Sequence, residues 1–275
     1  MAVPYKAPVK DIVFGYEVID SYNVLNKISA FSDFSEDIVI PTMEECAKFS
    51  EEVLAPINAI GDQQGATIKD GVVTMPEEFV DAYKKFAEAG WASISLPSDI
   101  GGGGMPITLS GGTLEILSTA NLAFGLAPGL SAGAISAINF HGNQEQKDKF
   151  LPKLVSGEWT GTMNLSEPQS GSDLGTITTK AEPQEDGSYK ITGTKVWITF
   201  GEHNMTENII HLVLAKVPGS PEGTKGISMF IVPKYIVNDD GSIGDSNNVS
   251  CISIEEKLGI HASPTCVMEY DGSVG

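Results

Sequence analysis

One stretch of the sequence combines hydroxyl groups with turn-forming residues. It runs from Met163 to Asp173, reads MNLSEPQSGSD, and places Ser166 and Ser172 around a proline and a glycine. In such a turn, successive backbone N–H groups can hold an anion or the edge of a ring. The stretch therefore predicts a binding loop, although a serine- and glycine-rich turn on its own is more often structural.

A second stretch places an aromatic ring beside a hydroxyl group. It reads KVWITFGEHN from Lys195 to Asn204 and is predicted to begin as a strand. Because side chains alternate along a strand, Trp197 and Thr199 are expected to face the same side. A tryptophan in a β unit usually lies in the core, so the stretch alone leaves a structural and a binding role open.

The elements before these stretches are predicted to be helical. Amphipathic or uniformly apolar spacing predicts helices over residues 41–60, 76–89, 109–124 and 143–157. Pro56 is expected to end the first of these helices, and Asn143 to cap the last. Four consecutive glycines, 101–104, predict a loop. The opening segment, 5–34, is expected to be irregular with one short helix.

From about Trp159 the pattern changes to short strands separated by Gly, Pro, Asn and Asp. The predicted strands cover residues 180–199, 209–217, 226–232, 249–254 and 266–270. The first folds into a hairpin at Glu185-Asp186-Gly187. An α+β fold is therefore expected, with an antiparallel β-sandwich or barrel after an all-helical domain. We assign residues 1–35 to an N-terminal extension, 36–158 to the helical domain and 159–275 to a middle β domain.

Composition and charge narrow the function classes. The chain has 275 residues, 41% of them hydrophobic, and a formal net charge of −19. That charge disfavours nucleic-acid binding, because the chain would repel a phosphate backbone. The sequence contains no uninterrupted apolar run of about 18 residues, the length that a membrane span requires. We therefore expect a cytoplasmic protein with no membrane partner. Three scattered cysteines without a CxxC pair predict neither a disulfide framework nor a metal site.

Other motifs point to different chemistry. The segment Gly129 to Gly133, GLSAG, matches the GxSxG pattern of serine hydrolases, which requires a strand before the serine and a helix after it. The residues before it are predicted to be helical, so we interpret Ser131 as a small residue in a tight connection between helices. Four scattered histidines without HxxxH spacing do not predict a metal centre. Gly101 to Gly104 do not match the dinucleotide-binding GxGxxG.

Three motifs, in order, resemble those of the acyl-CoA dehydrogenases. Ser166-Glu167-Pro168 with Gly171-Ser172-Asp173 resembles the family's TEPxxGSD loop, and Trp197-Ile198-Thr199 its W-I-T strand. Lys257-Leu258-Gly259-Ile260 with Ser263-Pro264-Thr265 resembles its KxGxxxSxT turn. The resemblance covers nearly the whole chain and implies the family's N-terminal helical and middle β domains. Stretches such as Trp159 to Met163 are most similar to the long branch that includes 3-methylmercaptopropionyl-CoA dehydrogenases.

The resemblance implies a binding site for FAD. Its flavin would be bordered by residues from both stretches, namely Met163, Leu165, Ser166, Gly171, Ser172, Trp197, Ile198 and Thr199. The Ser166 hydroxyl and nearby amides would be donors, the Thr199 hydroxyl would approach flavin N5, and Ser172 would also touch the coenzyme A portion of the substrate. The sequence departs from the family pattern at Ser166 (usually Thr), Gln169-Ser170, Phe200 and His261, where the family usually has Arg.

The resemblance also implies the activity: α,β-dehydrogenation of an acyl-CoA thioester, of medium size or containing sulfur, with electrons passed to electron-transfer flavoprotein. This reaction needs a carboxylate as general base, which in the family is a glutamate in a C-terminal helical domain, expected beyond residue 275. We therefore assign no catalytic residue within the chain.

The sequence ends at Gly275 directly after a predicted strand, so we expect a fragment. Such a fragment would be inactive and bind flavin weakly by itself, because one wall of the pocket is expected beyond it. The family implies a homodimer or homotetramer at full length. Alternatives are a flavin acyl-CoA oxidase or a non-catalytic flavoprotein on the same scaffold, and more distantly a serine hydrolase using Ser131.

Overall fold

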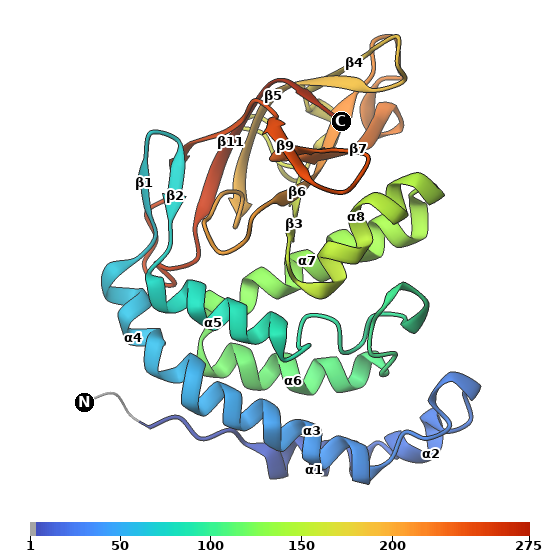
Figure 1. The fold of residues 1–275 in the computed structure, drawn as a ribbon, viewed down its shortest axis with the longest axis vertical. Helices are drawn as coiled ribbons and strands as arrows, with labels where there is room; N and C mark the ends of the chain where they lie inside the picture. Colours follow the sequence, from blue (N-terminus) through green and yellow to red (C-terminus); the bar gives the residue numbers. More distant parts are fainter. Residues whose placement is uncertain (1–3) are drawn as a thin grey trace.

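Helices form the first part of the chain and a curled β domain the second, in a computed structural model that describes residues 4–275 (Figure 1). The helices are α1 (Val9–Val18), α2 (Ser21–Leu25), α3 (Glu36–Phe49), α4 (Ala55–Gln64), α5 (Glu77–Glu88), α6 (Ile107–Ala120), α7 (Leu122–His141) and α8 (Gln144–Ser156). The strands are β1 (Thr67–Lys69), β2 (Val72–Thr74), β3 (Thr160–Asn164), β4 (Lys180–Pro183), β5 (Tyr189–Thr199), β6 (Ile209–Lys216), β7 (Ile227–Pro233), β8 (Tyr235–Val237), β9 (Ile243–Ser246), β10 (Val249–Ile254) and β11 (Thr265–Val274). The predicted α+β class is confirmed.

Local capping signals located two helices well. Helix α8 begins with a capping box, in which the Asn143 side chain accepts from the Gln146 N–H at 2.8 Å and the Gln146 side chain accepts from the Asn143 N–H at 2.9 Å. Gly157 ends the helix in a left-handed conformation. Helix α5 follows Pro76 as predicted. The boundaries of both helices are thus determined by residues within one turn of their ends.

The prediction that Pro56 ends its helix was wrong. The chain continues from α3 through a π-helical turn, Ser50–Leu54, directly into α4, whose first turn holds Pro56. Proline lacks an N–H and crowds the carbonyl four residues earlier, and the wider π turn accommodates both effects. The opening segment also differs from the prediction, because it forms two helices, α1 and α2. Val13 and Tyr16 of α1 are buried in the helical core.

The predicted helix over residues 109–124 is divided at Asn121. This residue is extended and caps α7 by accepting a hydrogen bond from the Phe124 N–H. Helix α7 has the length and composition of a membrane-crossing helix, which the sequence prediction did not anticipate. It packs against α6, α8 and β3, and much of its surface is buried, as in the core helix of a globular domain.

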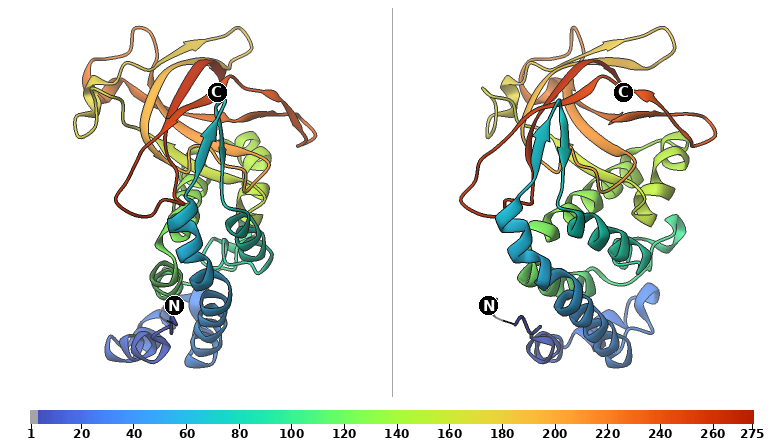
Figure 2. Two further views of the ribbon diagram at one scale, coloured as in Figure 1. Left: turned by 90° about the vertical axis from the view of Figure 1, so that its left-hand side faces the viewer. Right: turned by 60° about the vertical axis from the view of Figure 1, so that its left-hand side comes forward.

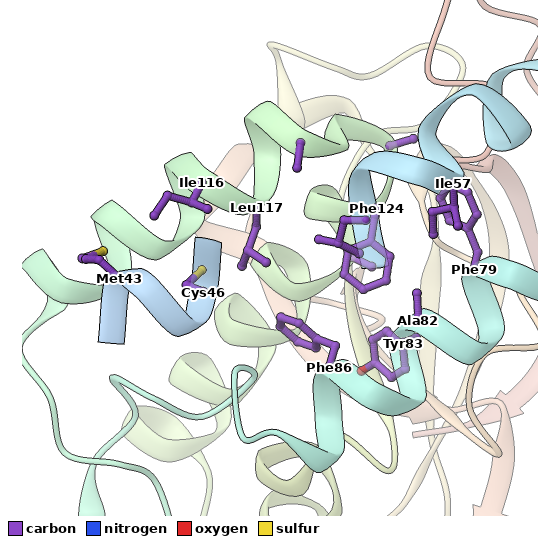
Figure 3. Packing of buried hydrophobic residues seen from close by; sticks show 14 of the residues in the cluster. Met43, Cys46, Ile57, Phe79, Ala82, Tyr83, Phe86, Ile116, Leu117 and Phe124 are labelled. Carbon is purple, nitrogen blue, oxygen red and sulfur yellow. The ribbon is translucent and has the colours of Figure 1, made fainter. Parts of the chain in front are cut away.

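The helical core is rich in aromatic side chains. Phe79, Tyr83 and Phe86 on α5 face Phe124 on α7 (Figure 3), and the rings of Phe86 and Phe124 meet edge to face with centroids 5.6 Å apart. Phe200, Met205 and Ala262 belong to the same core although they follow the strands β5 and β10. Segments of the β domain therefore contribute to the helical core, while the sheet also has an apolar cluster of its own.

The main sheet has seven strands in the order β10-β11-β5-β4-β6-β3, with β7 also paired to β6. Most neighbours are antiparallel, and the hairpin predicted at residues 185–187 joins β4 to β5. The antiparallel character predicted for this domain therefore holds for most strand pairs, and β3, which runs parallel to β6, is an exception that the sequence did not indicate. The loop after β3 and the β4–β5 hairpin, and not a tight turn, separate β3 from its parallel partner β6.

The sequence prediction missed two small hairpins. One is β1–β2, in the region predicted to be helical, where Asp70 and Gly71 both have positive φ at the turn. This hairpin stands beside the β domain and contacts β10 (Figure 2). The other pairs β8 with β9. Strands of three or four residues are too short for a clear alternation of polar and apolar side chains.

Candidate functional site

The loop that follows β3 is a tight, internally bonded turn. Glu167 and Ser170 exchange two backbone hydrogen bonds, at 2.7 and 2.9 Å, with Pro168 and Gln169 at the tip. The Ser170 hydroxyl then donates to the Asp173 carbonyl at 2.6 Å. These contacts fix the loop and leave Ser166 half-buried on one side of it.

The buried side chain of Glu167 holds this loop in place through hydrogen bonds. Its carboxylate is 2% exposed and accepts hydrogen bonds from the N–H and hydroxyl groups of Thr178 and Thr179, at 2.6 to 3.0 Å. Gln169 and Lys195 donate to it as well, at 2.7 and 2.9 Å. Burial would raise the pKa of Glu167, but the hydrogen bonds from Thr179, Thr178 and Lys195 outweigh it and lower the pKa to about 2. Glu167 is thus an ionised carboxylate with a structural role, and its oxygens are fully hydrogen-bonded.

Trp197 lies at a bulge near the end of β5. The register with β11 shifts there, since Ile198 is opposite Cys266 whereas Lys195 is opposite Met268. Trp197 has φ of 60° at this bulge, a left-handed conformation that is unfavourable for a bulky side chain. The residue is 59% exposed, so the structural alternative, a core tryptophan, was wrong. Trp159 fills the core instead.

Backbone contacts bring the three motifs together. The Val196 N–H donates to the Ser166 carbonyl at 2.9 Å, which joins the loop after β3 to β5. Thr199 is paired with Thr265 on β11, and the Phe200 N–H donates to the Pro264 carbonyl at 2.8 Å. Side chains that are far apart in the sequence thus surround one surface region beside Trp197.

The residues predicted to border the flavin differ in their exposure to solvent. Met163, Leu165 and Thr199 are partly exposed, as is Ser166. Gly171 and Ser172 are exposed, and a Cβ added at Gly171 would meet no atom within 4 Å. Ile198 is 3% exposed, so only its backbone can face a ligand.

The turn between β10 and β11 attaches the β domain to α4 (Figure 2). The Lys257 ammonium donates to the Ser263 carbonyl at 2.8 Å. The His261 ring lies between the Lys257 carbonyl and Asp62, with Nδ1 2.8 Å from a carboxylate oxygen of Asp62. Hydrogen bonds to the carbonyls of Asp62 and Lys257 raise the pKa of His261. His261, at a position where the resembled family usually has arginine, therefore links α4 to the turn between β10 and β11.

The alternative nucleophile, Ser131, has a structural role. It lies inside α7, and not in a connection between helices as predicted, and its hydroxyl oxygen accepts from the Gly161 N–H at 3.1 Å. The strand–turn–helix of a hydrolase elbow is absent at this position. Within residues 4–275 no group of His, Cys, Asp and Glu side chains is arranged to hold a metal ion. Burial lowers the pKa of both His203 and His211 to about 3, so both rings are neutral.

Sequence reasoning missed Lys195. This lysine is completely buried, donates to Glu167 and to the Leu165 carbonyl, and stands two residues before Trp197 on β5. The available signal was its neighbourhood, since a lysine directly before the apolar stretch Val196-Trp197-Ile198 needs a partner if that strand is buried.

Two family models match the chain in succession. The model for the N-terminal domain of acyl-CoA dehydrogenase matches residues 41–158, and that for the middle domain matches residues 162–273. The chain belongs to the acyl-CoA dehydrogenase family through these two domains.

Individual relatives agree with this assignment. The chain is 45% identical over 98% of its length to 3-methylmercaptopropionyl-CoA dehydrogenase of Ruegeria pomeroyi. It is 38% identical over 97% of its length to a butyryl-CoA dehydrogenase of Syntrophomonas wolfei. These alignments cover 46% and 44% of the two relatives, so the chain spans about half the length of the curated relatives it matches.

A solved structure shows the same architecture with a cofactor. The acyl-CoA dehydrogenase of Bacillus anthracis complexed with FAD superimposes with a TM-score of 0.69 and 27% identity, over 88% of this chain and 37% of that one. A chain in the structure of the electron transferring flavoprotein of Acidaminococcus fermentans gives a TM-score of 0.69 and 25% identity, over 88% of this chain and 56% of that one.

Proposed function

We propose that the protein containing this chain is a FAD-dependent acyl-CoA dehydrogenase that removes two hydrogens across the α,β bond of an acyl-CoA thioester. The observation that carries the proposal is Trp197, a large aromatic ring held exposed by a left-handed bulge beside the Ser166 loop. Strained backbone conformations cluster at functional sites. An exposed ring beside polar groups suits a flat, hydrogen-bonding ligand such as an isoalloxazine.

The residues present fit a flavin. Trp197 offers a stacking face, and the partly exposed Ser166 and Thr199 offer hydroxyl donors in neighbouring segments of the chain. We assign Met163, Leu165, Ser166, Gly171, Ser172, Trp197, Ile198 and Thr199 to the FAD site, with Ile198 acting through its backbone. Bound FAD would supply the acceptor for the β-hydrogen as hydride. The Ser166 donors would stabilise negative charge at the flavin's pyrimidine side, and Thr199 would approach its N5 atom.

We place the general base outside this chain. Glu167 has the right chemical group and the right neighbourhood, but its pKa of about 2 makes it a poor proton acceptor, and six donors occupy its oxygens. We therefore infer that residues 1–275 by themselves are inactive and bind flavin weakly. The complete protein would be a homodimer or homotetramer that passes electrons to electron-transfer flavoprotein.

The substrate assignment follows from the relatives. Proteins named for butyryl-CoA and 3-methylmercaptopropionyl-CoA dehydrogenation support a short or sulfur-containing acyl-CoA, where the sequence led us to expect a medium-sized or sulfur-containing one. The net charge of −19 repels coenzyme A, so binding of its phosphates must be local. Exposed Ser172, at the end of the loop, is the residue we assign to the coenzyme A portion. We also infer a cytoplasmic location.

Two measurements on the full-length protein test this function. The purified protein should carry one FAD per chain by its visible spectrum, and should reduce an artificial electron acceptor when given butyryl-CoA or 3-methylmercaptopropionyl-CoA. Ser166→Ala and Thr199→Val should each weaken FAD binding about tenfold, since each removes a hydrogen bond to a group that becomes charged. Ser188→Ala, in the distant β4–β5 hairpin, is the matched control. A full-length protein that takes up no FAD would overturn the proposal.

A further inference from the structure

A single buried cation connects the two stretches of the proposed flavin site. The Lys195 side chain is 0% exposed, and its ammonium donates to the Leu165 carbonyl at 3.0 Å and to Glu167 at 2.9 Å. Leu165 directly precedes Ser166, and Lys195 precedes Trp197 by two residues. One ammonium group is therefore in contact with the loop after β3 and belongs to the strand that presents the tryptophan.

The contact with Leu165 fixes the direction of a neighbouring donor. The Leu165 C=O and the Ser166 N–H belong to one planar trans peptide group, so they point in opposite directions. Because the carbonyl points at Lys195, the Ser166 N–H points away from it. The other peptide group of Ser166 is fixed too, because its carbonyl accepts from the Val196 N–H at 2.9 Å.

The Ser166 N–H is available for a ligand. Within residues 4–275 it has no hydrogen-bond acceptor, although Ser166 is half-buried, the Glu167 N–H donates to the Ser170 carbonyl and the Leu165 carbonyl accepts from Lys195. A backbone N–H left without an acceptor in a folded site is uncommon unless water or a ligand completes it. A cation bound to the carbonyl of the same peptide draws electron density from the nitrogen and strengthens the N–H as a donor.

We propose that Lys195 is a positioning residue that, through the Leu165–Ser166 peptide, orients and strengthens the Ser166 N–H as a donor to the pyrimidine edge of the flavin. The inference rests on the proposed function and deepens it. Glu167 keeps the ammonium charged and in place at this depth, since an unpaired buried lysine would lose its proton. The ion pair has no net charge, so it acts on the cofactor through the oriented Ser166 N–H dipole and does not touch the cofactor itself.

The test is the relative binding of oxidised and reduced FAD by the full-length protein, obtained from the midpoint potential and the dissociation constant of oxidised FAD. A donor aimed at the pyrimidine edge favours reduced flavin, on which negative charge accumulates. Lys195→Met should therefore weaken binding of reduced FAD about tenfold more than that of oxidised FAD, the effect of one hydrogen bond to a charged group. Lys195→Arg should restore most of the difference.

Matched variants separate positioning from folding. Lys234→Met removes a lysine that is also paired with a buried glutamate, Glu202, but that has no contact with residues 165–167; it should leave the oxidised-to-reduced binding ratio within about twofold of wild type. The double variant Glu167→Gln with Lys195→Met removes both buried charges and should fold even if the single variant does not. In the double variant, the ratio of oxidised to reduced FAD binding should remain shifted from that of wild type, as in Lys195→Met.

The outcomes are distinct. A wild-type ratio in a folded Lys195→Met or in the double variant would overturn the role of Lys195 while leaving the flavin assignment intact. An equal shift in Lys234→Met would also overturn it, because the effect would then be general destabilisation. Wild-type protein without bound FAD would instead contradict the proposed function itself.

Discussion

Glu167 and Glu202 are both buried carboxylates paired with a lysine, yet their surroundings shift their pKa values in opposite directions. Glu167, in the loop after β3, accepts hydrogen bonds from six donors, and its pKa falls to about 2. Glu202, in the segment after β5, has Lys234 as its side-chain partner, and burial raises its pKa in spite of that lysine. A lysine alone does not offset burial, whereas a ring of backbone and hydroxyl donors does.

The difference matches the roles of the two regions. The loop after β3 presents Ser166 to the proposed cofactor, and it needs a fixed backbone, which the bonds to Glu167 provide. The segment after β5 carries Phe200 and Met205 into the helical core, so apolar packing already holds it. We infer that Glu167 is required for the shape of its loop, and that Glu202 contributes far less to its segment.

Removing the two carboxylates is the strongest way to break this comparison. Glu167→Ala leaves the Lys195 ammonium and several donors buried without an acceptor, and we expect a loss of about 3–5 kcal/mol in the free energy of unfolding. Glu202→Ala leaves Lys234, whose side chain is 17% exposed and can reach water, and should cost about 1–2 kcal/mol. Urea unfolding followed by circular dichroism measures both. Equal losses would show that the six donors do not matter.

The pH dependence of stability sharpens the comparison. The pKa of Glu167 is lower in the folded chain, about 2, than the ordinary 4.5 expected when unfolded. Its contribution, roughly 3 kcal/mol, is therefore present above pH 4.5 and is lost as the pH falls toward 2. The pKa of Glu202 is raised, so its contribution has the opposite sign: it is present below 4.5 and is lost as the pH rises through the folded value.

Urea unfolding of wild type and two glutamine variants, across pH values from about 2 to about 7, checks these signs. Glu167→Gln should flatten the decline of stability on the acid side of 4.5. Glu202→Gln should instead flatten the change on the neutral side. If the two variants altered the same pH range, the assignment of opposite shifts would fail.

Two glycines extend the comparison to packing, with the smallest expected effects. Gly161 on β3 lies against α7, and an added Cβ would stand 2.4 Å from the Ala134 Cβ, closer than atoms can pack. Gly161→Ala should therefore cost about 1–3 kcal/mol in the free energy of unfolding. Gly171, in the exposed loop, has open space, and Gly171→Ala should change stability by less than about 0.5 kcal/mol. A thermal melt of the two variants gives the ranking; a Gly171 effect as large as that of Gly161 would contradict it.

Much of the fold was predictable because its signals are local. The capping box at Asn143, the Pro76 start of α5 and the Asp186-Gly187 hairpin each act within a few residues, so the sequence identifies them directly. Predictions failed where the outcome depended on an irregular backbone turn or on a distant partner strand. Pro56 is accommodated inside a long helix, and β3 pairs in parallel with β6 more than forty residues later in the chain.

The site shows the same division. Residue types and order were enough to select the Met163–Asp173 loop and the Trp197–Thr199 strand as binding segments, because hydroxyls, glycines and a tryptophan in those patterns carry the resemblance. The sequence could not show that Trp197 is exposed or that Lys195 is bonded to Leu165 and Glu167, partners 30 and 28 residues away. Local spacing specifies which groups are present, whereas burial and hydrogen-bond partners depend on which distant segments fold against them, and only the tertiary structure decides that.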